Sequence, residues 1–185
     1  MIQTLANHKV LAVTLAAIAV FGGGVAAVPA AVFDDPAQQA GPTSPVVVQP
    51  SDGSVDVGET TTFDVVVPNA DGGVGAYNLT VGLSDSSVAS ITDVEFGGDP
   101  GLTETPVETD STVTARAALA DTADTGSVTV LTVTVEGLAD GTTDLTLDVN
   151  ALGTEEGINY AVPQATGATL TVGEGDTQPA PANYD

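Results

Sequence analysis

Cysteine and tryptophan are absent from this chain of 185 residues, and histidine occurs once. Without cysteine the chain can form no disulfide, thiolate nucleophile or Cys-based zinc site. The only histidine, His8, precedes a long apolar segment, so the remainder of the chain has no Ser-His or Cys-His pair for nucleophilic catalysis. Aromatic side chains that could stack on sugar rings are also few. We therefore expect a non-catalytic protein with no cofactor and no metal site.

Positive charge is almost as scarce. The chain has 25 acidic residues against two basic ones, Lys9 and Arg116, which gives a net charge of −23. A surface of this kind repels itself at ordinary ionic strength, and concentrated salt screens the repulsion. The composition resembles that of proteins from extreme halophiles; an acidic protein from a low-salt organism is the alternative. Binding to nucleic acid is excluded, because no cationic patch could neutralise phosphates.

The N-terminal 30 residues have the order of an export signal. His8 and Lys9 precede the apolar segment 10–21, three glycines follow, and small residues continue to Ala30. This order predicts a secretory signal peptide cleaved after Ala27 or Ala30. The alternative is a retained membrane anchor, since residues 10–33 are long enough to span a bilayer. Both interpretations predict an extracellular or cell-surface protein, which contacts a membrane only through this segment and only if the segment is not cleaved.

Composition divides the rest of the chain into three parts. Residues 31–45 form a Pro-rich linker without apolar periodicity, and residues 173–185, with Pro179 and Pro181, form a similar tail. Residues 46–172 lie between them and have enough apolar side chains for one ordinary core. We expect this part to be the folded domain.

Apolar residues in the domain recur with a period of two, which is typical of β-strands. The clearest case is 76–84, where Tyr77, Leu79, Val81 and Leu83 alternate with polar or small residues. The expected strands are 46–48, 61–67, 76–84, 94–96, 111–119, 129–135, 143–149, 159–162 and 168–172. The other side chains expected to point inward are Phe63, Val65, Val67, Val113, Ala115, Ala117, Leu119, Leu131, Val133, Leu145, Leu147 and Leu170.

Turn residues separate these segments. The turns expected from Gly with Asp or Glu are Asp52-Gly53, Asp71-Gly72-Gly73, Asp140-Gly141 and Glu156-Gly157. No stretch after Phe33 has a helical pattern. Eight to nine short strands with one polar face each predict an all-β fold, a single β-sandwich.

The order of several segments resembles that of cohesin domains. Residues 55–67 (VDVGETTTFDVVV) are similar to the family's opening turn and strand, and residues 73–83 (GVGAYNLTVGL) to its next strand. Residues 129–147 match its later hairpin, and residues 167–172 its last strand. The similarity covers roughly residues 46–172. Where cohesins usually carry a Tyr-Asp-Pro-type turn, this chain has Ser84-Asp85.

The resemblance implies a nine-stranded jelly roll that binds a protein partner, a calcium-loaded dockerin, through one sheet face. The partner face it implies lies at Ala76 and Asn78, and Thr80 follows on the same side of the strand. Two other functions stay open. A carbohydrate-binding sandwich, which would bind polysaccharide, would need exposed aromatics, for which Tyr160 is the candidate because Tyr77 points inward. A structural surface or filament subunit would assemble by pairing edge strands.

One glycosylation motif is present. Asn78-Leu79-Thr80 is the only Asn-x-Ser/Thr sequence in the chain, and the alternation places Asn78 on the outward side of its strand. Asn78 is therefore the candidate N-glycosylation site. A sugar there would lie on the face that a cohesin offers to its partner.

Overall fold

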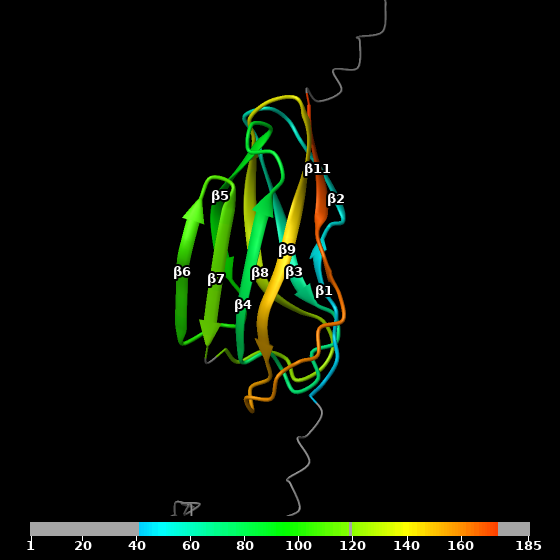
Figure 1. The fold of residues 1–185 in the computed structure, drawn as a ribbon, viewed down its shortest axis with the longest axis vertical. Helices are drawn as coiled ribbons and strands as arrows, with labels where there is room; N and C mark the ends of the chain where they lie inside the picture. The colour runs from blue at the N-terminus through cyan, green and yellow to red at the C-terminus, as the bar shows by residue number, and fades with distance from the viewer. Residues whose placement is uncertain (1–40, 119, 174–185) are drawn as a thin grey trace, which may run out of the picture. The chain divides into compact units, whose positions relative to one another are not determined.

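Two sheets packed face to face make up the part of the chain that the computed structural model describes, residues 41–118 and 120–173 (Figure 1). The five-stranded sheet has the order β10 (Ala165–Thr166), β1 (Val46–Gln49), β3 (Thr60–Val67), β8 (Val128–Gly137) and β5 (Ala89–Phe96). The six-stranded sheet has the order β2 (Asp52–Val55), β11 (Ala168–Val172), β9 (Gly141–Gly153), β4 (Ala76–Leu83), β7 (Thr112–Ala118) and β6 (Leu102–Thr109). The described residues contain no helix, and hence none that could cross a membrane.

In each sheet, a strand from the beginning of the domain lies beside a strand from its end. β1 pairs in parallel with β10, and β2 pairs in parallel with β11, whereas all the other strand pairs are antiparallel. Backbone bonds continue this pairing beyond the strands, from Ser44 N to Ala161 O and from Gly173 N to Val55 O. The described chain begins at one end of the sandwich and leaves at the other (Figure 1).

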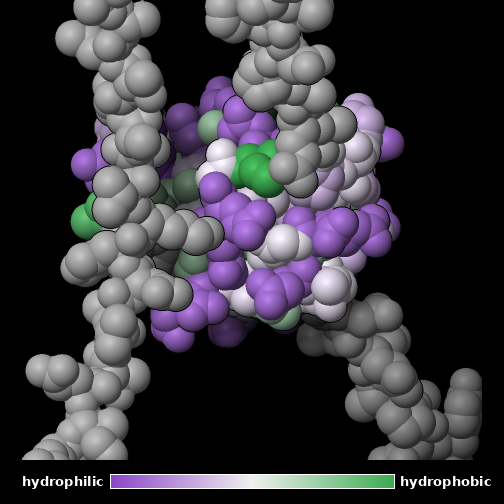
Figure 2. All heavy atoms as spheres, turned by 90° about the horizontal axis from the view of Figure 1, so that it is seen from below, coloured by the Kyte–Doolittle hydropathy of each residue, from purple (hydrophilic) through white to green (hydrophobic). Residues whose placement is uncertain are grey.

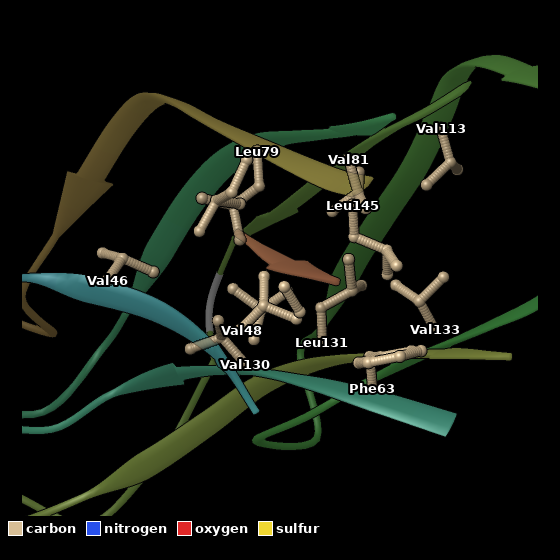
Figure 3. Close-up of a cluster of buried hydrophobic side chains, with 14 of the residues drawn as sticks. Val46, Val48, Phe63, Leu79, Val81, Val113, Val130, Leu131, Val133 and Leu145 are labelled. Carbon is tan, nitrogen blue, oxygen red and sulfur yellow. The ribbon is translucent and has the colours of Figure 1, made fainter. Parts of the chain in front are cut away.

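Valine and leucine from both sheets fill the space between them. Figure 3 shows side chains of one sheet, such as Leu79 and Leu145, pointing toward Val133 and Phe63 of the other. These four side chains are at most 1% exposed. β-Branched residues are well suited to this packing, because their side chains are held stiffly on the pleated surface. The core therefore rests on the period-two pattern.

A tyrosine links the two sheets through a hydrogen bond. The hydroxyl of Tyr77 on β4 donates to the backbone oxygen of Val130 on β8. The Tyr77 ring also stacks on Phe96 of β5, with centroids 6.5 Å apart. Burial raises the pKa of the Tyr77 phenol, because the apolar surroundings disfavour the phenolate. This contact fixes β4, the strand that carries Asn78, against the opposite sheet.

The β-sandwich predicted from the sequence is confirmed. The predicted inward side chains are buried, except that Leu83 is partly buried and Leu119 lies outside the described residues. The turns at Asp71-Gly72 and Glu156-Gly157 are also found, the first with left-handed φ values of 81° and 65° at Gly72 and Gly73. The alternation thus predicted the core correctly.

Several local predictions were wrong. Asp52-Gly53 lies in β2 and not in a turn, since both residues pair with β11. Strand 94–96 is the end of the longer β5, and β6 was not predicted. Residues 159–162 form only isolated bridges, at Asn159 and Ala161. The predicted signal peptide or anchor (1–30), most of the linker (31–45) and nearly all of the tail (173–185) lie outside the described residues.

Candidate functional site

The outward side of the six-stranded sheet is broad and carries mainly small and hydroxyl side chains. We call it the six-strand face, and its central members are Ala76, Asn78, Thr80, Gly82, Thr112, Thr114, Arg116, Asp144, Thr146, Asp148 and Ala151. They share this face because side chains alternate along each strand and the register aligns those that point outward. The structure thus places both predicted partner-face residues, Asn78 and Thr80, at its centre.

Hydrogen bonds fix the hydroxyl groups on this face. The Oγ1 atoms of Thr80 and Thr114 lie 3.1 Å apart across β4 and β7. The amide of Asn150 donates to Thr80 Oγ1 at 3.3 Å, and Thr146 Oγ1 donates to the Gly82 carbonyl at 3.1 Å. Because these side chains hold one another, the face offers a partner a largely preordered surface.

A β-bulge in β9 lies beside Asn78. Asn78 pairs with Ala151 and Leu79 with Val149, so Asn150 is an extra residue in the β9 ladder. A bulge of this kind bends its strand and redirects a side chain. Here it turns the Asn150 amide toward Thr80. No pattern in the sequence indicates this bulge, because it depends on the register between two strands distant in the chain.

A shallow pocket of about 340 Å³ lies at this point on the six-strand face. Small residues surround it, and Tyr77 and Leu152 are among those that line it. We call it the Asn78 pocket; its polar lining includes Asn78, Arg116 and Asn159. Sequence reasoning did not find Arg116, Ala151 or Asn159 as parts of this site, since they come from β7, β9 and the loop after β9.

The loop that borders the Asn78 pocket is held by several polar contacts. The Tyr160 hydroxyl donates to the carbonyls of Asp71 and Gly73, at 2.9 and 2.7 Å. Burial, with the nearby carboxylates of Asp71 and Glu155, raises the pKa of Tyr160. Glu155 in turn accepts the backbone N–H of Thr122 at 2.7 Å. These bonds join the loops at the lower end of the sandwich, which exposes mainly hydrophilic side chains (Figure 2).

The aromatic side chains of the described region do not form a sugar-binding surface. Tyr160 is 7% exposed, so the prediction that it is a surface aromatic was wrong: its ring packs in the core and its hydroxyl is used within the loop. Tyr77 and Phe63 are buried, and Phe96 packs partly buried against the core. Among the described residues, no aromatic is therefore available to stack on a polysaccharide.

A larger hollow of about 920 Å³ lies where β5 meets the β6–β7 turn. Its lining includes Ser90, Thr92, Glu108, Asp110 and Leu138, and it contains neither an aromatic nor a basic residue. Within the described residues no group of three or more His, Cys, Asp or Glu could hold a metal ion. The six-strand face is consequently the candidate functional surface of the described residues.

Among known proteins, similarity to this chain is found at the level of the fold. No family model matches the chain, and no curated protein does. Among solved structures, it is similar to a non-cellulosomal cohesin from the archaeon Archaeoglobus fulgidus, with a TM-score of 0.54, 19% identity and coverage of 70% of this chain and 91% of that one.

Bacterial cohesins give similar values. The seventh ScaB type I cohesin of Pseudobacteroides cellulosolvens has a TM-score of 0.57 at 14% identity, covering 77% of this chain and 97% of the other. The Coh-OlpA–Doc918 cohesin–dockerin complex of Clostridium thermocellum has a TM-score of 0.56 at 13% identity, covering 70% and 99%. The likeness shows the fold: the two sheets are arranged as in cohesin domains.

Proposed function

We propose that this chain, which has the cohesin fold, is a non-catalytic extracellular binding module that attaches a dockerin-type protein partner through its six-strand face. The observation that carries the proposal is the face itself. It is an ordered surface of small and hydroxyl side chains, hollowed at Asn78, on a fold whose solved examples include cohesins in complex with dockerins.

The two rival functions lack matching surfaces in the described residues. A carbohydrate-binding module needs exposed aromatic rings, and those described are packed inside. A filament subunit needs free, regular edge strands. Two edges, β2 and β10, have four and two residues. The other edges, β5 and β6, are interrupted by register shifts, and β6 contains Pro106, which cannot donate a ladder hydrogen bond.

Binding experiments with matched surface variants test the proposal. The probes are calcium-loaded dockerin domains, with Doc918 as one member of the panel, titrated calorimetrically in concentrated salt. Ala151→Trp places a large neutral side chain beside Asn78 on the six-strand face, and Thr62→Trp places the same side chain on the exposed side of β3 in the other sheet. We expect at least one dockerin to bind the wild type and Thr62→Trp equally, and Ala151→Trp to bind at least about tenfold more weakly.

Two results of these titrations would contradict the proposal. If no dockerin binds, or if Ala151→Trp and Thr62→Trp bind alike, the six-strand face is not the partner surface. Circular dichroism of both variants shows whether each keeps the β-sandwich.

N-glycosylation of Asn78 stays a prediction, and it competes with docking. The side chain lies in the middle of β4 and lines the Asn78 pocket, so a glycan on it would cover the surface that the partner needs. Docking therefore requires Asn78 without a sugar. Mass spectrometry of the exported protein tests this, and a fully glycosylated Asn78 would exclude docking through this pocket.

A further inference from the structure

Arg116 is the only basic residue in the part of the chain that the structure describes. It is exposed on β7 and lies opposite Asn78 of β4 on one side and Glu104 of β6 on the other. Its guanidinium group carries several N–H donors in a plane and stays charged at any ordinary pH. The single cation thus borders the Asn78 pocket, near the centre of the six-strand face.

Asn78 adds a second donor to the same pocket. Its Oδ1 atom is buried and accepts no hydrogen bond. Because the oxygen is turned into the protein, the amide N–H₂ group is the end of the side chain left to face the pocket. Ala76, Ala151 and Gly153 around it are small and leave the space above the amide open. Two donor groups, one of them charged, therefore border one hollow.

From this arrangement we propose that the Asn78 pocket recognises a carboxylate side chain, Asp or Glu, of the protein partner, bound by Arg116 and by the Asn78 amide. The inference rests on the docking function proposed above and adds the chemistry of the contact. A carboxylate has two oxygens that can accept hydrogen bonds from both donors at once, and it is the anionic group that protein side chains supply, so its bonds to arginine are of the stronger, charge-assisted kind.

The charge of the rest of the surface makes this contact selective. The other charged side chains of the described region are carboxylates, so a partner carboxylate placed elsewhere meets charge of its own sign. Concentrated salt screens the distant repulsion, whereas a pair in contact inside a pocket is screened much less. The position of Arg116 therefore determines where the carboxylate of an acidic partner binds. Glu104, which lies opposite Arg116 on β6, is the carboxylate of this chain that competes with the partner's for the guanidinium group.

The test uses two probes of nearly the same shape, acetyl-Asp-amide with a carboxylate and acetyl-Asn-amide with a neutral amide in its place. Each is titrated into the isotope-labelled full chain at constant high salt, and the side-chain N–H signals of Arg116 and Asn78 are followed by NMR. We expect saturable shifts of both signals with the Asp probe, and at least about fivefold weaker binding of the Asn probe. Arg116→Gln should abolish the response, and Glu104→Gln should strengthen it by removing the competing carboxylate.

Several results would overturn the inference. It fails if the Asp probe produces no saturable shift, if both probes act alike, or if Arg116→Gln responds like the wild type while its backbone spectrum shows an intact fold. The dockerin titrations separate this failure from failure of docking itself. If Ala151→Trp loses the dockerin and Arg116→Gln keeps wild-type affinity, docking stands and only the carboxylate contact is wrong.

Discussion

The hydroxyl of Tyr77 makes a hydrogen bond that crosses from one sheet to the other, where it satisfies the Val130 carbonyl in the core. Tyr77→Phe keeps the ring and its stacking on Phe96 but removes one of the two hydrogen bonds that this carbonyl accepts, since the backbone N–H of Gly97 still donates to it at 2.9 Å. The net contribution of one such hydrogen bond to stability is about 0.5–1.5 kcal/mol. We expect the free energy of unfolding, measured with urea in concentrated NaCl, to fall by this amount.

A matched control for Tyr77→Phe removes a hydroxyl from the surface. Thr171→Val changes an exposed side chain on β11, and we expect its stability to stay within about 0.5 kcal/mol of the wild type. Equal losses in both variants would show that the Tyr77 hydroxyl does not stabilise the sandwich through Val130.

The same phenol predicts how stability changes in alkali. Burial raises the pKa of Tyr77 above its ordinary value of about 10. Above about pH 10 the unfolded chain releases the phenol proton while the folded chain keeps it. The free energy of unfolding therefore falls as pH rises, by at most about 1.4 kcal/mol per pH unit for this group. Urea midpoints measured from about pH 9 to 11 should decline less steeply in Tyr77→Phe. Tyr160, whose pKa is raised too, leaves a residual slope; identical slopes in both proteins would contradict the prediction.

At the scale of strands, the pairing of β11 with β9 depends on a glycine. A Cβ atom on Gly167 would lie 1.9 Å from the Leu145 carbonyl oxygen, so β11 would have to move away from β9. We expect Gly167→Ala to lower the free energy of unfolding by about 1–3 kcal/mol and to speed hydrogen exchange of the β11 amides.

Gly173→Ala is the control for Gly167→Ala. A Cβ at Gly173 would have no neighbour within 4 Å, so we expect wild-type stability and exchange. If Gly167→Ala has the same stability and exchange as this control, the prediction is wrong, and position 167 tolerates a Cβ atom despite the close approach of the Leu145 carbonyl.

The strands that sequence reasoning predicted and missed differ in burial. Strands with one buried side, such as β4, show alternating side chains, and their period of two was readable without a structure. β6 is an edge strand whose described side chains are exposed, so no apolar period marked it. Asp52-Gly53 is a residue pair typical of turns, so the sequence pattern predicts a turn where the structure has β2. Its conformation is set by pairing with β11, more than a hundred residues away, and a local pattern does not contain that information.

Within the candidate site, the side to which a residue points could be predicted from the sequence, whereas its neighbours on other strands could not. Alternation placed Asn78 and Thr80 on the outward side of β4. Arg116 was visible as a rare cation, but its position opposite Asn78 follows from the register of β4 and β7. The bulge at Asn150 and the loop that brings Asn159 to the Asn78 pocket also depend on contacts between distant segments.

At the scale of the whole molecule, charge governs stability. With a net charge of −23 and one basic residue in the described part, the folded surface repels itself unless salt intervenes. The screening length falls from about 10 Å at 0.1 M salt to about 3 Å at 1 M. We expect the thermal midpoint to rise steeply over this range with NaCl. An equal concentration of sucrose, which is uncharged, should raise it much less; a midpoint independent of salt would contradict the prediction.

The parallel pairing of the outermost strands has a mechanical consequence. The described chain enters at one end of the sandwich and leaves at the other, with β1 beside β10 and β2 beside β11. When the two ends are pulled apart, each pair must slide lengthwise, and its hydrogen bonds share the load at the same moment. Hairpin strands pulled from one end would instead release their bonds one after another. Both terminal pairs therefore resist such a pull in shear, the direction in which a β-sheet is hardest to separate.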